Sequence, residues 1–384
     1  MFDPRDPAFL ADPYPEFARL RAQAPVHQHD GLGLAIAVSH AAASAVLRHR
    51  GLGRIWTDAS PAEQFVSFNL LHRNSLLENE PPVHTRLRRS ISSAFGRGHV
   101  ERLRPTVMRL ADELVAGIAD AGSADLLDAL AQPLPVAVIS ELLDVPEADR
   151  PRLVPWSNAI VKMYEYGLPE EGRVAAERAA TEFVEFLREL AERRRREPGE
   201  DLITDLLRAE LTEDEVVATA VLLLMAGHEA TVNVIGNGVW ALLRHPDQWQ
   251  RLVDDPGLMP AAVEELIRFD SPLQLFERTA TEDVEIAGFR VAKGEKIAAL
   301  LGAAARDPEV FAEPDTLDVA RSDGTHLGFG AGIHYCIGAP LARIEIAAAL
   351  VALTKRLPGL RLAGEPERRP EFVIRGLKNL PVTV

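Results

Sequence analysis

The sequence predicts a mainly α-helical protein with a minor β portion, organised as one large domain over residues 1–384. Segments with apolar residues at three- and four-residue spacing dominate the chain, and short strand-like segments lie near the start, past the middle and at the end. No low-complexity linker or repeat divides it. Hydrophobic residues make up 47% and charged residues 26%, which are typical of a globular protein with a sizeable core.

The individual elements follow from this spacing. The pattern predicts helices over residues 13–23, 109–121, 175–197 and 341–357. It predicts strands within residues 32–39, 283–300 and 371–384, with a hairpin turn at Ala287-Gly288.

One helix is unusually long. Thr212 and Glu215 form a capping-box pattern, and no proline follows until Pro246, so the helix spans about 33 residues and roughly 50 Å. Its first half is apolar nearly all round, which predicts that it crosses the protein interior. The segment AGHEAT, residues 226–231, then has two interpretations. In the first, Gly227 relieves a tight helix crossing and Glu229 reaches a surface. In the second, the helix opens locally and places Glu229 and a hydroxyl beside a reaction centre.

Charge and cysteine content restrict the partners and the compartment. The net charge of −15 argues against nucleic acid. One cysteine excludes a disulfide framework and suits a reducing cytoplasm, and the start of the chain lacks the pattern of a signal peptide or membrane anchor. Residues 86–109 contain seven arginines and one acid, Glu101. This stretch either steers an acidic partner or forms a solvated helical face.

Cys336 lies in the segment FGAGIHYCIGAP, residues 329–340. Pro340 suits the first turn of a helix, so the cysteine precedes a helix N-terminus, where free amides and the helix dipole favour a thiolate. A nucleophile needs a base, for which His334 is a candidate, but no oxyanion-stabilising group is evident. A zinc site needs more ligands, and an inert buried cysteine is the simplest alternative. A single ligand to a large prosthetic group fits better, and haem is the usual one.

Two further pairs are weak evidence alone. Glu265 and Arg268 are three residues apart on a predicted helix, a spacing common on helix surfaces. His84 and Arg88 are four residues apart and share one helix face, which suits either a bound carboxylate or solvent.

In this order, these segments resemble the cytochrome P450 monooxygenases of the soluble bacterial kind, over nearly the whole chain. FGAGIHYCIG fits the family's haem-ligand pattern Phe-Gly-x-Gly-x-His-x-Cys-x-Gly at every fixed position. ELIR fits its Glu-x-x-Arg element, EPPVHTRLRR its C-helix, and AGHEAT its oxygen-binding groove.

The resemblance implies a haem b cofactor with Cys336 as the axial thiolate. Phe329 is then expected beside the sulfur, with backbone amides made accessible by glycines such as Gly338. The haem propionates would bind four donors from separate segments: His84, Arg88, Arg278 and His334. Glu265, Arg268 and Arg321 would form the family's buried structural triad.

The groove departs from the family pattern of an acid followed by threonine. Here Glu229 is followed by Ala230, and the threonine comes one residue later as Thr231. One residue turns a helix by about 100°, so Thr231 cannot simply replace the missing hydroxyl. Water could relay protons from Glu229, a substrate hydroxyl could fill the gap, or His228 and Thr231 could form another network. Our hypothesis is substrate-assisted proton delivery.

The implied reaction is haem-thiolate monooxygenation, hydroxylation or epoxidation of an apolar small organic molecule, with O2 as co-substrate. Nothing in the chain binds flavin, nicotinamide or an iron–sulfur cluster, so NAD(P)H acts only indirectly, through a ferredoxin or flavodoxin and its reductase. We expect a monomer whose docking arginines are Arg86, Arg89, Arg97 and Arg102. Alternatives are peroxide-driven, desaturating or coupling chemistry, a non-catalytic haem sensor, or a haem-free helical binding protein.

The resemblance also implies a pocket of aliphatic and aromatic side chains, although these residues would suit an ordinary core equally well. The expected lining residues are Phe68, Leu70, Met163, Leu223, Ala226, Leu273, Leu275, Phe276 and Val373.

Overall fold

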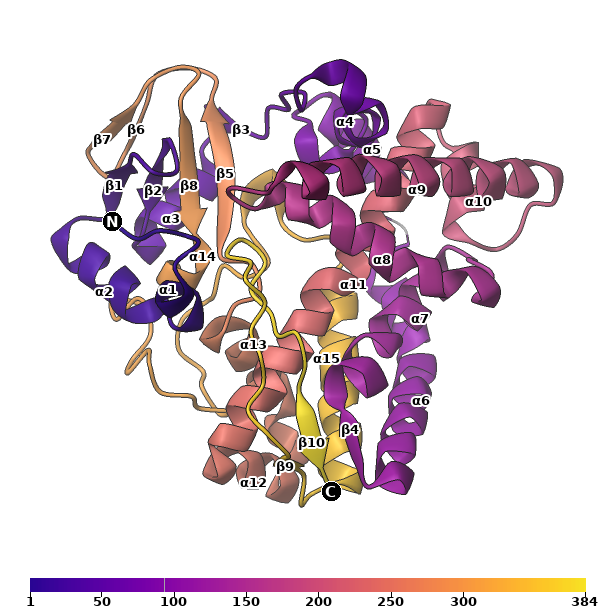
Figure 1. Ribbon diagram of the computed structural model, residues 1–384, viewed down its shortest axis with the longest axis vertical. Helices are drawn as coiled ribbons and strands as arrows, with labels where there is room; N and C mark the ends of the chain where they lie inside the picture. Colours follow the sequence, from indigo (N-terminus) through magenta and orange to yellow (C-terminus); the bar gives the residue numbers. More distant parts are fainter. Residues whose placement is uncertain (93) are drawn as a thin grey trace. The chain divides into compact units, whose positions relative to one another are not determined.

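The computed structural model describes residues 1–92 and 94–384, apart from the side chain of Arg97. The chain forms two compact units. The first comprises Met1–Gly53, Arg104–Leu134 and Ala230–Val384, and the second comprises Arg54–Leu103 and Pro135–Glu229. The predicted fold class, mainly α with a small β portion, is confirmed (Figure 1).

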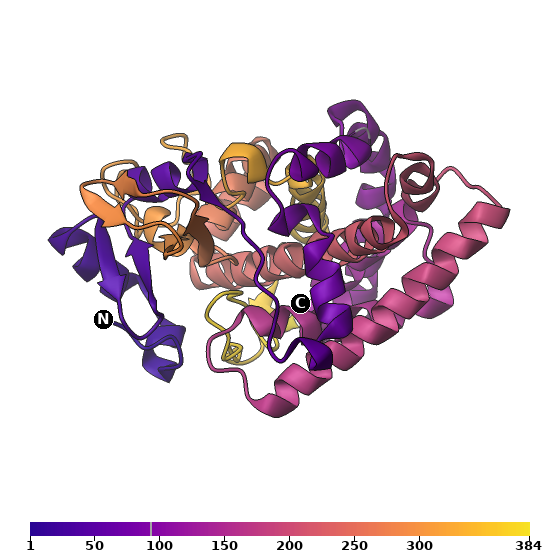
Figure 2. The same cartoon turned by 90° about the horizontal axis from the view of Figure 1, so that it is seen from above.

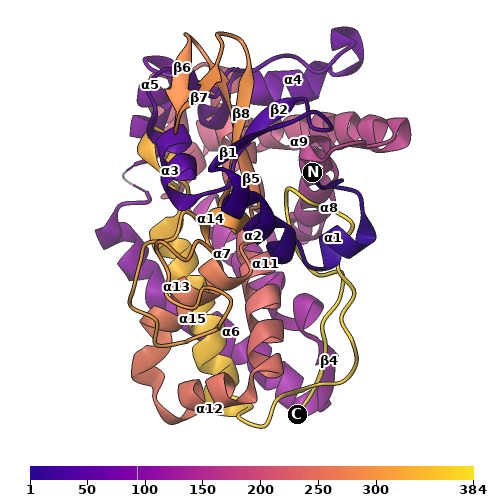
Figure 3. The same cartoon turned by 90° about the vertical axis from the view of Figure 1, so that its left-hand side faces the viewer.

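A mixed five-stranded sheet organises the first unit, in the order β1-β2-β8-β5-β3. Its strands pair antiparallel except β2 and β8, which run parallel and lie side by side in Figure 3. The strands are β1 (Val26–His29), β2 (Leu34–Ala37), β3 (Leu52–Gly53), β5 (Leu275–Ala280) and β8 (Lys296–Leu300). All four residues of β2 are buried, which explains its unbroken apolar run in the sequence.

The predicted hairpin is present as β6 (Val284–Ile286) and β7 (Phe289–Val291). Ala287 and Gly288 both have positive φ, as a two-residue turn between twisted strands requires. A small second sheet, in the order β4-β10-β9, joins β4 (Ser123–Asp125), β9 (Arg361–Leu362) and β10 (Pro381–Thr383).

The first unit also contains helices. They are α1 (Pro7–Ala11), α2 (Tyr14–Gln23), α3 (His40–Arg48), α12 (Pro246–Asp254), α13 (Met259–Phe269), α14 (Leu301–Ala304) and α15 (Ala339–Arg356), with short turns η6 (Pro256–Leu258) and η7 (Gly332–His334) and a π-helical turn η3 (Leu127–Ala131). Two helices, α6 (Arg97–Ala121) and α7 (Pro133–Leu142), begin in one unit and end in the other. The predicted helices over 13–23, 109–121 and 341–357 are thus confirmed.

The second unit is helical. It contains α4 (Val66–Arg73), α5 (Val83–Ile91), α8 (Arg150–Val161), α9 (Glu170–Arg196) and α10 (Leu202–Arg208), with short turns η1 (Ala62–Gln64), η2 (Leu76–Glu78), η4 (Glu147–Asp149) and η5 (Lys162–Tyr164). The long helix α9 packs on both α8 and α4. It begins with two acids and ends with four arginines, which complements the helix dipole at both ends.

The long helix α11 spans Glu213–Arg244 and is drawn in salmon in Figure 2. Its residues up to Glu229 belong to the second unit and those from Ala230 to the first. Its capping box is reciprocal, as predicted: the Thr212 amide donates to Glu215 Oε2 at 2.9 Å, and the Glu215 amide donates to Thr212 Oγ1 at 3.2 Å. By length and composition alone, α11 could span a membrane, but 78% of its apolar window is buried in the protein. This burial is typical of a core helix, as the sequence predicts.

Candidate functional site

The segment around Cys336 is a glycine-shaped loop in front of a helix. The Cys336 amide donates to the Phe329 carbonyl at 2.9 Å, which closes the loop. Gly330 and Gly332 both have φ of +70°, and a Cβ on Gly332 would lie 2.6 Å from the Leu47 carbonyl oxygen. Helix α15 begins at Ala339, directly after this loop. The predicted position of the cysteine, just ahead of a helix N-terminus, is therefore correct.

A charged cluster of Glu264, His326 and Arg343 lies beside the Cys336 loop and contacts Phe329 through Arg343. The Arg343 guanidinium carbon lies 4.5 Å from the Phe329 ring centroid, and Arg343 donates twice to Glu264, at 2.6 and 2.9 Å. His326 Nδ1 accepts from the Gly328 amide, so Nε2 carries the proton and donates to Glu264 at 3.1 Å. Burial alone raises the pKa of Glu264, but its bonds from Arg343 and His326 lower that pKa to about 2. Sequence reasoning missed this cluster.

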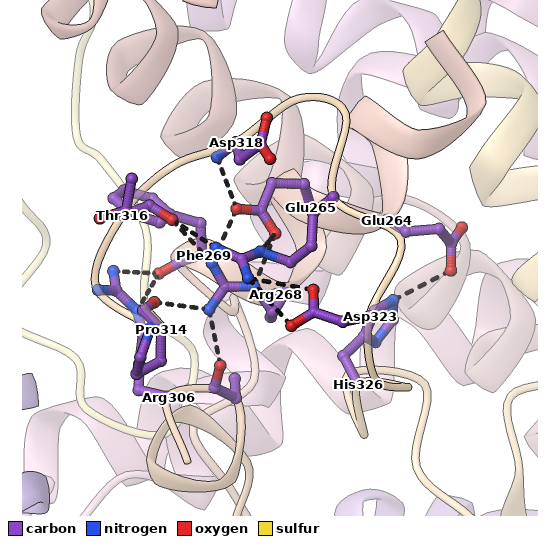
Figure 4. A network of polar contacts seen from close by, with 12 residues as sticks. Glu264, Glu265, Arg268, Phe269, Arg306, Pro314, Thr316, Asp318, Asp323 and His326 are labelled. Atoms are coloured by element: carbon purple, nitrogen blue, oxygen red, sulfur yellow. Dashed lines mark hydrogen bonds and ion pairs between the residues drawn. The ribbon is translucent and has the colours of Figure 1, made fainter. Parts of the chain in front are cut away.

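The expected triad is present in the first unit (Figure 4). Arg268 donates to both oxygens of Glu265, at 2.6 and 2.8 Å, and Arg321 Nε donates to Glu265 Oε2 at 3.0 Å. Glu265 and Arg268 are each 2% exposed. Two cations thus share one buried carboxylate.

Main-chain carbonyls and the carboxylate of Asp323 take up the remaining donors of the triad. Arg268 Nη1 donates to the carbonyls of Ala305 and Pro314, both at 2.8 Å, and Arg321 Nη2 donates to that of Thr316 at 2.9 Å. The Asp318 amide donates to Glu265 at 2.9 Å, as Figure 4 shows. The triad therefore fixes the meander of residues 305–321, which leads toward the Cys336 loop.

The four expected propionate donors lie in both units. In the first unit, Arg278 lies on β5 and is 4% exposed, while His334 ends η7 two residues before Cys336. A Cβ on Gly330 would lie 3.8 Å from the Phe276 ring, so β5 runs close to the cysteine loop. In the second unit, His84 and Arg88 lie one turn apart on α5, with His84 buried and Arg88 partly buried.

The groove segment of α11 has one open side. Ala226 is exposed and Ala230 is partly exposed, whereas Glu229 and Thr231 are only 6% and 4% exposed. Residues four apart share a helix face, so Ala226 and Ala230 line the same side, whereas buried Thr231 is turned by about 100° from Ala230. An exposed stripe on an otherwise buried helix is what a bound planar group or substrate would cover.

Neither interpretation of AGHEAT is correct in full. Helix α11 continues as α-helix through the segment, so the expected local opening is wrong. A Cβ on Gly227 would lie 2.8 Å from Ile139 Cγ1 of α7, which supports a tight helix crossing. The idea that Glu229 reaches a surface is also wrong, because this carboxylate is buried.

The expected pocket residues come from five segments. Phe68 and Leu70 lie on α4 and Met163 in η5, all in the second unit, and Leu223 lies on α11. In the first unit, the Gln274 amide donates to the Val373 carbonyl at 3.0 Å, so the segments carrying Leu273 and Val373 lie side by side. Leu273, Phe276 and Val373 are partly exposed, whereas Leu275, Phe68 and Leu223 are buried.

Comparisons with known proteins agree with this geometry. The sequence model of the family described as Cytochrome P450 matches residues 58–358. The chain is 40% identical to cytochrome P450 monooxygenase PikC of Streptomyces venezuelae, over 97% of this chain and 91% of that protein. It is 38% identical to vitamin D(3) 25-hydroxylase of Pseudonocardia autotrophica, over 98% and 94%.

Among solved structures, the chain resembles P450BioI in complex with an acyl carrier protein ligated to hexadec-9Z-enoic acid. The TM-score is 0.95 at 34% identity, covering 98% of this chain and 99% of that one. Members of this family hold haem b through a cysteine thiolate, use O2, and receive electrons from NAD(P)H through partner proteins. The chain therefore belongs to the cytochrome P450 family and is a haem-thiolate monooxygenase of small organic molecules.

Proposed function

We propose that Cys336 is the axial ligand of the haem iron, and that the enzyme hydroxylates or epoxidises an apolar organic molecule. The observation that carries this proposal is the position of the chain's only cysteine in a glycine-shaped loop before α15. Unpaired amides and the helix dipole at that end favour a thiolate. When bound, the haem supplies the activation of dioxygen.

The donor set fits a haem with two carboxylates. Cationic or donor side chains at His84, Arg88, Arg278 and His334 suit propionate groups, and we propose them as the propionate ligands. The charged cluster of Glu264, His326 and Arg343 would keep Phe329 in place beside the sulfur.

The absorption spectrum of the reduced protein under carbon monoxide tests this assignment. A thiolate ligand gives the red-shifted Soret band of the family, and Cys336→Ser should abolish that band while helical circular dichroism is retained. An unchanged band in Cys336→Ser would contradict the role of Cys336. Product formation with surrogate redox partners then separates a monooxygenase from a haem sensor.

For proton delivery, we propose that the substrate supplies the missing hydroxyl at Ala230. Support comes from the side chains: Ala230 lies on the open side of α11, and Thr231 is buried on another side. Glu229 remains the nearest acid in sequence. The same alanine favours a second candidate, peroxide-driven oxidation, which turnover with hydrogen peroxide in the absence of reductase would reveal.

For electron supply, we propose a ferredoxin or flavodoxin with its reductase. Of the expected docking arginines, Arg89 and Arg102 are exposed, whereas Arg86 is paired with Glu215. The side chain of Arg97 lies outside the described residues. We therefore assign docking to Arg89 and Arg102.

We further propose that both units form one functional domain over residues 1–384, because α11 runs unbroken from one into the other. We propose a cytoplasmic monomer without a membrane anchor or nucleic-acid partner, in keeping with the net charge of −15 and the buried state of α11.

A further inference from the structure

A second buried charge cluster of the first unit lies around Asp270, the C-cap residue directly after α13. Asp270 is 6% exposed and accepts three side-chain hydrogen bonds. Tyr14 Oη donates at 2.7 Å, Arg375 Nε at 2.7 Å and Arg368 Nη2 at 2.6 Å. No part of the expected site includes these four residues.

The cluster keeps Asp270 ionised. Burial alone raises the pKa of Asp270, but the charges of Arg368 and Arg375 outweigh burial and hold that pKa well below its usual range. Arg375 Nη1 and Nη2 donate to the carbonyls of Leu10 and Ala11, at the end of α1. Figure 3 shows the C-terminal segment, in yellow, passing beside α1. The ion pair thus ties three distant parts of the first unit together.

The backbone of Arg375 joins two segments that carry expected pocket residues. Its amide donates to the Pro272 carbonyl at 2.7 Å, and the neighbouring residues Leu273 and Ile374 form an isolated antiparallel bridge. Such a short pairing has few hydrogen bonds to set its register. The buried side chain of Arg375, anchored on Asp270, therefore supplies much of the constraint on this pairing.

The same segment lies against α11 close to the groove. A Cβ on Gly376 would lie 2.0 Å from Asn233 Oδ1, and Asn237 Nδ2 donates to the Arg375 carbonyl at 3.1 Å. Asn233 and Asn237 follow Ala230 by three and seven residues, so all three share one face of α11. The segment around Val373 is thus held against the helix face that carries Ala230.

We propose that Asp270 is a positioning residue for substrate, acting through Arg375 and Arg368. It fixes the paired segments 272–276 and 373–376 beside Ala230 and so determines which part of a bulky ligand reaches the iron. This inference rests on the proposed haem site and pocket. Asp270 itself does not line the pocket, so its effect should depend on ligand size rather than on haem binding.

The test compares a small and a bulky iron ligand on the holoenzyme, namely imidazole and econazole, by absorption titration. Asp270→Asn keeps the side-chain shape and removes the charge. We expect an unchanged carbon monoxide band and imidazole affinity, with econazole binding weakened about tenfold or more, because small misplacements are costly in a fitted site. Asp283→Asn, which removes an exposed partner of Arg290 in the same unit, is the matched control and should change neither affinity.

Arg368→Gln is the second variant, in case Asp270→Asn does not fold. It removes one of the two cations on Asp270 and should shift the econazole-to-imidazole ratio in the same direction by less. An unchanged ratio in a variant with a normal carbon monoxide band overturns this inference alone. Equal loss for both ligands also overturns it, since that result marks a purely structural role. No thiolate band in the wild type removes the proposed function and this inference with it.

Discussion

Glu265 and Arg268 face each other one turn apart on α13, joined by two hydrogen bonds of 2.6 and 2.8 Å, with both side chains almost fully buried. Arg321 adds a second cation to the same carboxylate. Glu265→Gln should therefore leave the buried charge of Arg268 uncompensated, while Arg321 keeps Asp323 as a partner, and should cost about 3–5 kcal/mol of unfolding free energy. Chemical denaturation of the holoenzyme measures this loss.

The matched control for Glu265→Gln is Arg251→Gln. Arg251 pairs with Asp318 in the same unit, but both side chains are more than 40% exposed. Its loss should cost less than about 1 kcal/mol. Equal costs for the two variants would contradict a structural role for the buried triad.

Gly332→Ala should disturb the Cys336 loop. The new methyl group would meet the Leu47 carbonyl at 2.6 Å, in a backbone with φ of +70°. We expect a loss of roughly 1–3 kcal/mol and a smaller thiolate-bound fraction in the carbon monoxide spectrum. Gly359→Ala is the control, because a Cβ there has no neighbour within 4 Å. A normal spectrum for Gly332→Ala would show that the loop tolerates the added methyl group.

Glu345→Gln should stabilise the protein at neutral pH. Glu345 on α15 is 1% exposed, and burial raises the pKa of its carboxyl well above the usual value. A raised pKa means that the native state resists ionisation, so stability falls as pH rises from about 4.3 toward the native pKa. The melting temperature of Glu345→Gln should exceed that of the wild type at pH 7.5. The difference in melting temperature should be smaller at pH 5. A difference that does not grow with pH would refute the raised pKa.

Ala230→Thr tests substrate-assisted proton delivery. Once a compound screen for haem spin-state shifts has identified the substrate, product formed per NAD(P)H consumed should change by less than about twofold, because the substrate hydroxyl already serves the proton path. Thr231→Ala is the control and should also change little, since Thr231 is buried away from the open side. A large rise in coupling for Ala230→Thr would remove the hypothesis.

Charge reversal at Arg89 or Arg102 should raise the apparent KM for the electron donor and leave haem content unchanged. Both arginines are exposed on α5 and α6. Arg290→Glu, on the exposed hairpin β6–β7, is the control. If the charge reversals at Arg89 and Arg102 gave the same apparent KM for the electron donor as Arg290→Glu, this docking surface would be excluded.

Features set by local sequence were predictable. The capping box of Thr212 and Glu215, the hairpin turn at Ala287-Gly288 and the helix start after Cys336 all depend on neighbouring residues. The pairing of Arg321 with Glu265, 56 residues away, followed only from the family resemblance.

Features that depend on distant segments were missed. Arg375 and Asp270 are 105 residues apart, and Arg343 and Glu264 are 79 apart, so no periodicity links them. The buried state of Glu229 also depends on packing against α11, which a helix pattern does not specify.

Glu215 serves two partners at once. Its carboxylate closes the capping box with the Thr212 amide and also accepts a bidentate pair from Arg86 of α5. An external acid that takes Arg86 must compete with this carboxylate. A stronger Glu215–Arg86 pair lowers the affinity of a partner protein for Arg86. By thermodynamic reciprocity, a partner that binds Arg86 weakens the pair at the first turn of α11 to the same extent. Partner binding at Arg86 of α5 and the ion pair at the start of α11 are therefore negatively coupled.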